Sequence, residues 1–160
     1  MQRFIQYRCL SHRAMILRAT GSAQGLTEAT REPRAPSERE LKVRVHCCGV
    51  SSLDVMNRKG AFPFIKTPII LGHEVSGVVV EVGSGCSSNI AVGDKVLSLH
   101  WDQASSWPSP LTSSGPTKSI LGLLEDGGNQ EFMTAAEHTF MKFESKQEWS
   151  AAQAALSKYI

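Results

Sequence analysis

The stretch that decides the fold is Leu71-Gly72-His73-Glu74-Val75-Ser76-Gly77-Val78-Val79-Val80-Glu81-Val82. Its second half is dominated by valine. Because β-branched side chains pack well on a pleated surface, such a run is typical of a strand. Residues 75–82 are therefore predicted to form a buried strand. Gly83-Ser84-Gly85 follow it and predict a turn.

The segment upstream of this strand alternates in polarity. Leu41-Lys42-Val43-Arg44-Val45-His46-Cys47 places an apolar side chain at every second position, which indicates a half-buried strand. Ser51 and Ser52 then precede Leu53–Lys59, and Gly60 follows. A capping serine at the start and a glycine at the end predict a short helix between them.

Further short elements occupy most of the remaining chain. Strands are predicted at Met15–Ala19, Leu26–Arg31, Lys95–Leu99, Glu131–Thr134 and His138–Lys142. The stretch 102–119 is rich in Ser, Pro and Thr and predicts a surface loop, and Ser150 caps a predicted helix over Ala151–Lys158. Many short strands and little helix predict a mostly β domain, either a barrel or a sandwich.

The composition excludes several classes of function. The chain has 160 residues, 41% of them hydrophobic, which is enough for one domain with a core. Lys and Arg number 17 and Asp and Glu number 15, for a net charge of +2. This balance argues against a nucleic-acid partner. No apolar run reaches the roughly 18 residues of a membrane-spanning helix, so no membrane partner is expected.

The cysteines and the first residues bear on the cellular compartment. The four cysteines show neither a C-x-x-C pair nor a disulfide framework, which favours a reducing, cytoplasmic compartment. Residues 1–12 are predicted to form an N-terminal extension. The first 27 residues carry four arginines and no acidic residue. An organellar transit peptide has this composition, so a mitochondrial location is the lesser alternative.

Three segments together resemble a known family. They are Val45–Asp54, which reads VHCCGVSSLD, Pro68–Val79, which reads PIILGHEVSGVV, and Val82–Val96, which contains VGSG and VGDKV. Their order and spacing resemble the N-terminal domain of the medium-chain dehydrogenase/reductase superfamily, which includes zinc-type alcohol dehydrogenases and quinone reductases. The loop around Trp101 and Gly115-Pro116 resembles a zinc-poor branch of that superfamily.

The resemblance implies an architecture. It predicts a mostly β fold, a GroES-like, partly open β-barrel with short helices, over residues 13–149. Residues 150–160 would begin the linker helix to a Rossmann domain that the chain lacks. Val82–Ser88 starts like a dinucleotide fingerprint, but the third glycine is replaced by Ser88 and no periodic helix follows. The chain is therefore expected to be a fragment without its own cofactor fold.

The resemblance also bears on zinc. Ser51 occupies the position of the first cysteine ligand, and a serine hydroxyl binds zinc poorly in comparison with a thiolate. Leu53 stands where the family's alcohol dehydrogenases carry a proton-relaying hydroxyl. His73 matches the histidine ligand, and Tyr159 aligns with the third ligand. Residues 87–160 hold no cysteine for a structural zinc lobe. No metal site is therefore expected.

The candidate catalytic residues are His73, Ser51, Asp54 and Glu74. His73 would bind a substrate carbonyl or water, or would only pack as a hydrogen-bonded pair with Glu74. Asp54 would support the site from behind, or would be a solvated carboxylate on a helix face. Ser51 and Ser52 would face the nicotinamide or its phosphates, or would only cap the helix.

Three functions remain open at this point. The first is an oxidoreductase whose intact form transfers hydride between NAD(P)H and a small carbonyl, enone or quinone without zinc. The second is a zinc-dependent alcohol dehydrogenase. The third is a non-catalytic barrel that acts as an interaction module. The resemblance further implies a homodimer at full length, with NADP or NAD bound mainly by the missing domain, so that these 160 residues alone are expected to be inactive.

Overall fold

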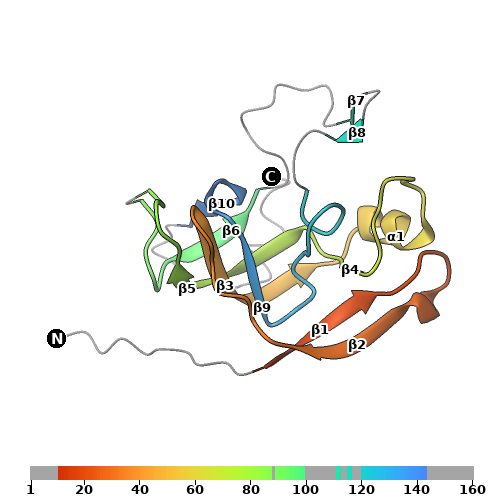
Figure 1. Cartoon of the computed structure of the whole chain (residues 1–160), viewed down its shortest axis with the longest axis horizontal. Helices are drawn as coiled ribbons and strands as arrows, with labels where there is room; N and C mark the ends of the chain where they lie inside the picture. Colours follow the sequence, from red (N-terminus) through yellow and green to blue (C-terminus); the bar gives the residue numbers. More distant parts are fainter. Residues whose placement is uncertain (1–10, 88, 100–110, 113–114, 117–119, 144–160) are drawn as a thin grey trace.

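The fold is built around a five-stranded antiparallel sheet (Figure 1). The computed structural model describes residues 11–87, 89–99, 111–112, 115–116 and 120–143. Within them the order of the sheet is β10-β6-β5-β3-β9. The bounds are β3 Glu40–Gly49, β5 Glu74–Val82, β6 Lys95–Ser98, β9 Phe132–Ala136 and β10 Phe140–Lys142. The mostly β architecture predicted from the sequence is confirmed.

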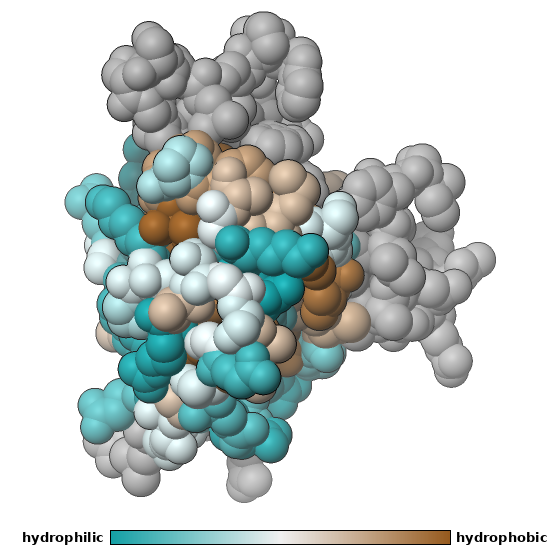
Figure 2. Space-filling view, turned by 90° about the vertical axis from the view of Figure 1, so that its right-hand side faces the viewer, coloured by the Kyte–Doolittle hydropathy of each residue, from teal (hydrophilic) through white to brown (hydrophobic). Residues whose placement is uncertain are grey.

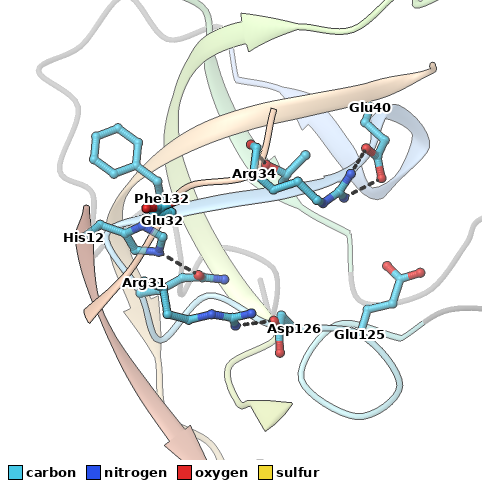
Figure 3. Close-up of a pocket in the computed structure, with 10 residues that line it drawn as sticks. His12, Arg31, Glu32, Arg34, Glu40, Glu125, Asp126 and Phe132 are labelled. Atoms are coloured by element: carbon cyan, nitrogen blue, oxygen red, sulfur yellow. Dashed lines mark hydrogen bonds and ion pairs between the residues drawn. The ribbon is translucent and has the colours of Figure 1, made fainter. Parts of the chain in front are cut away.

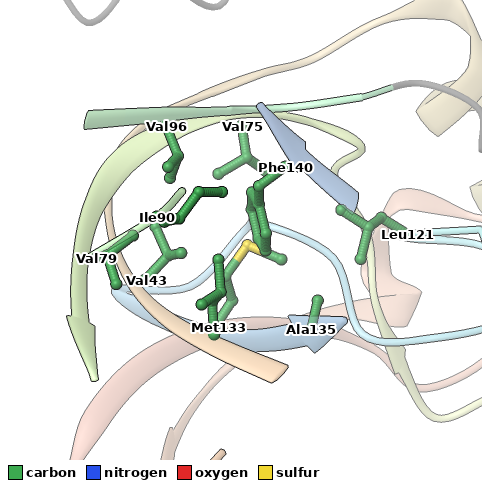
Figure 4. Close-up of a cluster of buried hydrophobic side chains, with 10 residues drawn as sticks. Val43, Val75, Val79, Ile90, Val96, Leu121, Met133, Ala135 and Phe140 are labelled. Carbon is green, nitrogen blue, oxygen red and sulfur yellow. The ribbon is translucent and has the colours of Figure 1, made fainter. Parts of the chain in front are cut away.

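The pairing of β3 with β5 forms the centre of this sheet. Val43 lies opposite Val79, and the register shifts twice, between Lys42 and Val43 and between Val45 and Cys47. Such irregularities bend a strand and increase its twist, which curves the sheet around its core. Ten buried apolar side chains fill the concave side (Figure 4). They are Leu41, Val43, Val75, Val79, Ile90, Val96, Leu121, Met133, Ala135 and Phe140.

A smaller sheet of order β2-β1-β4 lies beside the first one (Figure 1). Its strands are β1 His12–Leu17, β2 Leu26–Arg31 and β4 Ile69–Ile70, with the 3-10 turn η1 Ala23–Gly25 between β1 and β2. The sequence placed the first strand at Met15–Ala19, which is three residues too late at its start. His12 and Ala14 are buried and pair with β2, so the tertiary contacts extend the strand beyond its apolar centre.

Helix α1, Ser52–Lys59, confirms the predicted helix. Gly60 follows it with φ of 80°, a left-handed conformation that glycine adopts without steric cost. The helix packs its Asp54 and Asn57 side chains inward and exposes Val55 and Met56. A helix with polar residues on its buried side is unusual for a core, and this inward polar face forms part of the candidate site.

Several other sequence predictions change in the structure. The strand expected at His138–Lys142 begins at Phe140, after the 3-10 turn η2 Glu137–Thr139. Cys86, which follows the predicted Gly83–Gly85 turn, is half-buried, and its Sγ donates to the Glu40 carbonyl at 3.4 Å. Two short paired strands, β7 Leu111–Thr112 and β8 Gly115–Pro116, fall within the predicted loop.

Some predictions lie outside the described residues. These are the N-terminal extension up to residue 10, the helix over 151–158, the linker, the loop residue Trp101 and Tyr159. Across the part of the chain that the structure describes, no helix combines the length and the apolar character needed to cross a membrane.

Candidate functional site

The first turn of α1 forms the floor of the candidate site. Ser51 is the N-cap of the helix, and its Oγ accepts a hydrogen bond from the Leu53 amide at 3.1 Å. The Asp54 carboxylate reaches back to accept from the Ser51 amide at 2.9 Å. These reciprocal bonds make a capping box, which satisfies amides that the helix leaves without partners. The capping interpretation of Ser51 is therefore correct, and it fixes the hydroxyl in place.

Asp54 joins the helix to the strand that carries His73. Its Oδ1 accepts from the Gly72 amide at 2.9 Å and lies 3.5 Å from His73 Nδ1. The residue is only 4% exposed, so the interpretation of Asp54 as a solvated helix-face carboxylate is wrong. Burial would raise the pKa of Asp54, but the contact with His73 and the Ser51 and Gly72 amides outweigh it and lower the pKa. Asp54 is thus a fixed negative charge beside the imidazole.

His73 occupies the centre of the cluster. Its Nε2 lies 3.3 Å from Ser51 Oγ, at hydrogen-bonding distance, and 3.6 Å from Glu74 Oε1. Both His73 and Glu74 are 3% exposed. His73 and Glu74 therefore pack against each other, and Ser51 contacts the same imidazole. Ser51, Asp54, His73 and Glu74 meet in one place.

Ser98, at the end of β6, positions the His73 backbone. The buried Ser98 hydroxyl donates to the His73 carbonyl at 2.8 Å and accepts from the Val75 amide at 2.8 Å. Sequence reasoning missed this residue. The sequence signal is a serine that follows Val96 and Leu97 in a short strand, and serines in that position have many uses.

Asn57 is the second residue that sequence reasoning missed. It lies one helical turn after Asp54 and is 1% exposed, and its Nδ2 donates to the Gly122 carbonyl at 3.1 Å. The i, i+3 spacing of two polar residues on one helix face could have indicated it. Gly122 in turn packs against Gly72. Asn57 therefore ties α1 to the loop that supports the histidine strand.

The remaining candidates have clear positions. Ser52 is the first residue of α1 and its side chain is exposed, whereas Ser51 is half-buried. Cys48 is partly buried and packs against the main core. Of the four clustered residues, Ser51 is thus half-buried, whereas Asp54, His73 and Glu74 are buried.

The described residues do not supply a donor set that fits zinc. Within the described ranges, no three His, Cys, Asp or Glu side chains are grouped so that they could hold a metal ion. The oxygen at the expected thiolate position belongs to Ser51, which already accepts from the Leu53 amide. Both carboxylate oxygens of Asp54 already accept hydrogen bonds from backbone amides. Tetrahedral zinc needs at least three protein ligands that are free to bind it.

The sequence profile of the alcohol dehydrogenase GroES-like domain matches residues 37–145. The chain belongs to this family, the N-terminal domain of medium-chain dehydrogenases and reductases. The probable alcohol dehydrogenase AdhA of Mycobacterium tuberculosis is 35% identical over 124 residues, which are 72% of this chain and 35% of AdhA. The acryloyl-coenzyme A reductase of Sulfurisphaera tokodaii is 39% identical over 80 residues, 49% of this chain and 23% of the reductase.

Solved structures agree with the fold. The crystal structure of AibC superposes with a TM-score of 0.77 at 29% identity, covering 93% of this chain and 42% of AibC. A NAD-dependent alcohol dehydrogenase superposes with a TM-score of 0.73 at 27% identity, covering 89% of this chain and 42% of that enzyme. The chain therefore spans well under half the length of the relatives that it matches.

Proposed function

We propose that the protein that contains this chain is a NAD(P)-dependent oxidoreductase that reduces a small carbonyl, enone or quinone without zinc. The observation that carries the proposal is the contact between Ser51 Oγ and His73 Nε2 at 3.3 Å, at the position where the family's zinc enzymes place a thiolate ligand. The dehydrogenases and reductases among its relatives support the class of reaction.

The chemistry requires stabilisation of a developing oxyanion. When hydride from the bound nicotinamide reaches the substrate carbon, negative charge grows on the substrate oxygen. Ser51, whose hydroxyl donates to Asp54 Oδ2 at 3.3 Å in the structure, turns to donate its proton to that oxygen. With His73 protonated on both ring nitrogens, Nε2 then returns a proton to Ser51 Oγ, 3.3 Å away, which leaves a neutral imidazole with its proton on Nδ1 beside Asp54. Asp54 holds the imidazole through its 3.5 Å contact with Nδ1 and so acts as a positioning residue.

The surface around Ser51 suits an apolar substrate. Val50, the residue before it, is 75% exposed, and Val55 and Met56 expose apolar surface on α1. Figure 2 views the molecule from the side that carries α1 and shows apolar surface among hydrophilic side chains. Exposed apolar patches beside polar groups are typical of ligand sites. A quinone or an activated double bond, such as the acryloyl group in the relative's name, matches this surface.

The cofactor, assembly and compartment belong to the same proposal. Ser52, exposed at the start of α1, and Ser51 are proposed to face the nicotinamide ring or its phosphates from the barrel side. NADP or NAD would be held mainly by the remainder of the protein, and two copies would form a homodimer. The free cysteines Cys47, Cys48 and Cys86 favour the cytoplasm as a reducing compartment.

Substitutions at Ser51 test the proposal in the whole protein. We expect Ser51→Ala to lower kcat for NADPH-dependent quinone reduction by about a hundredfold, because a transition-state hydrogen-bond donor is lost. Ser51→Thr keeps both the hydroxyl and the helix cap and should retain most of the rate. Equal rates for Ser51→Ala and the unmodified protein would refute the role of Ser51, and no turnover with any quinone, enone or aldehyde would favour the interaction module.

A further inference from the structure

The buried face of α1 carries, besides Asp54, a second polar side chain whose hydrogen bonding is incomplete. Asn57 is 1% exposed, and its Nδ2 donates to the Gly122 carbonyl at 3.1 Å. Its Oδ1 is buried too, and none of the described residues gives this oxygen a hydrogen-bond partner. An apolar side chain of the same shape would fill the space without the cost of that oxygen. The amide at this position therefore points to a role for its contact with Gly122.

Gly122 belongs to a loop, residues 120–131, that is attached to the small sheet by contacts of its own. Asp126 Oδ1 accepts from the Ile70 amide at 3.0 Å, and Asp126 Oδ2 lies 2.6 Å from Arg31 Nη1. Figure 3 shows the pair of Arg31 and Asp126 among the residues that line a pocket beside this sheet. The loop is therefore a fixed support to which a second element can be aligned.

The same loop holds the backbone immediately before His73. The Gly128 amide donates to the Gly72 carbonyl at 2.7 Å. Gly122 packs so closely that a Cβ on it would lie 2.8 Å from the Gly72 amide nitrogen. That amide in turn donates to Asp54 Oδ1 at 2.9 Å. Because Gly72 is bound by the loop and by α1 at once, the position of His73 relative to α1 depends on how the helix is attached to the loop.

Asp54 and Asn57 are three residues apart on α1 and attach the same face of the helix at two points. Asp54 accepts from the Gly72 amide, and Asn57 donates to the loop. A short helix that is attached at one point can pivot about it, whereas a second attachment one turn away fixes its rotation. Ser51 is the N-cap of this helix, so the rotation of α1 sets where the Ser51 hydroxyl stands relative to His73.

We propose that Asn57 is a positioning residue for proton delivery by Ser51 and His73. Its bond to the loop holds α1 in the orientation that places Ser51 Oγ 3.3 Å from His73 Nε2. The inference rests on the proposed function, in which these two side chains supply the proton. Reacting groups that are misplaced by about 1 Å lose on the order of a hundredfold in rate, so a small rotation of α1 is enough to slow the reaction.

Two variants of Asn57 in the whole protein test this role. Asn57→Leu keeps the branched shape of the side chain and removes the donor. Because it also removes the unpartnered Oδ1, its urea midpoint should lie within about 0.5 M of that of the unmodified protein. Asn57→Ala removes the donor without adding any atom that could overpack the site. Both variants should lower kcat for NADPH-dependent quinone reduction about tenfold and change the quinone KM less than about twofold.

Thr134→Val is the matched control. It also removes a side-chain donor to a backbone carbonyl at 3.1 Å, from Thr134 Oγ1 to Arg34, but it does so on β9, at the edge of the main sheet. Its kcat should stay within about twofold of the unmodified value. An unchanged kcat in both Asn57 variants, an equal loss in Thr134→Val, or an effect confined to KM would overturn the positioning role.

A second readout does not depend on quinone reduction. In a Ser51→Cys background, the introduced thiol lies beside His73 and at the start of α1, where a thiolate is favoured and reacts fastest. The rate at which iodoacetamide modifies this thiol, followed by peptide mass spectrometry, should fall about threefold when Asn57→Leu is added and should stay the same with Thr134→Val. An unchanged rate with Asn57→Leu would overturn the inference. A slower rate in a protein that reduces no quinone would support the inference and count against the proposed function alone.

Discussion

At the scale of single residues, Asp54 carries the most interactions in the candidate site. Its two oxygens accept from the backbone amides of Ser51 and Gly72 and lie beside His73. Asp54→Asn would place amide hydrogens against these donors in a buried position. We expect it to lower the free energy of unfolding by about 3 kcal/mol, measured by urea titration near neutral pH.

The same carboxylate predicts a pH dependence. The pKa of Asp54 is lowered in the folded state from its ordinary value of 3.8, so the unfolded state binds more protons as the solution becomes acidic. Its contribution is complete above the unfolded pKa and is lost as the pH falls through the folded pKa. The stability difference between the unmodified protein and Asp54→Asn should therefore shrink below pH 3.8. A constant difference down to strong acid would contradict this account.

Ser51 also predicts a metal-binding difference. Ser51→Cys restores a thiolate beside His73, which improves the donor set for zinc. After incubation with zinc and gel filtration, the whole Ser51→Cys protein should retain more zinc than the unmodified protein, as measured by elemental analysis. If the unmodified protein retains one zinc ion per chain, the serine does not prevent metal binding.

At the scale of elements, two glycines share a similar left-handed backbone but differ in their surroundings, so their alanine variants distinguish backbone strain from a packing clash. Gly72, between β4 and β5, has φ of 98°, and a Cβ there would lie 2.5 Å from Cys48 Sγ and 3.0 Å from the Asn129 amide nitrogen. Gly93, in the turn before β6, has φ of 95° and no atom within 4 Å of that position. Of these two glycines, only Gly72 lies so close to neighbouring segments that an added Cβ would clash with them.

The two alanine variants should therefore differ in stability. Gly93→Ala should lower the free energy of unfolding by about 1 kcal/mol, because only the left-handed backbone is strained by the new Cβ. Gly72→Ala adds an overpacked contact and should lose about 3 kcal/mol or more in urea unfolding. Similar losses for both variants would mean that the junction between β4 and β5 is not packed as described.

At the scale of the whole molecule, two methionines in the main sheet report on the core. Met133 on β9 is 2% exposed and belongs to the main cluster, whereas Met141 on β10 is 46% exposed. Met133→Ala should lower the free energy of unfolding by about 3 kcal/mol through lost burial and a cavity. Met141→Ala should change it by less than about 0.5 kcal/mol. The reverse order in urea titration would mean that the core lies elsewhere.

The sequence predicts the elements better than it predicts the contacts between them. The valine run of β5, the alternation of β3 and the capped helix α1 are local patterns, and all three are confirmed. The convergence of Ser51, Asp54 and His73 followed from the family resemblance. The roles of Ser98 and Asn57 depend on partners from other elements. His12 and Gln130 are 118 residues apart, a pairing that no local pattern indicates.

The most direct test of the central claim is the initial rate of NADPH-dependent quinone reduction by the whole protein, before and after its metals are removed with a chelator. Because Ser51 and His73 supply the proton in this account, the rate should be unchanged by chelation. A rate that is lost on chelation and restored by zinc would contradict the account and would identify a zinc-dependent enzyme instead.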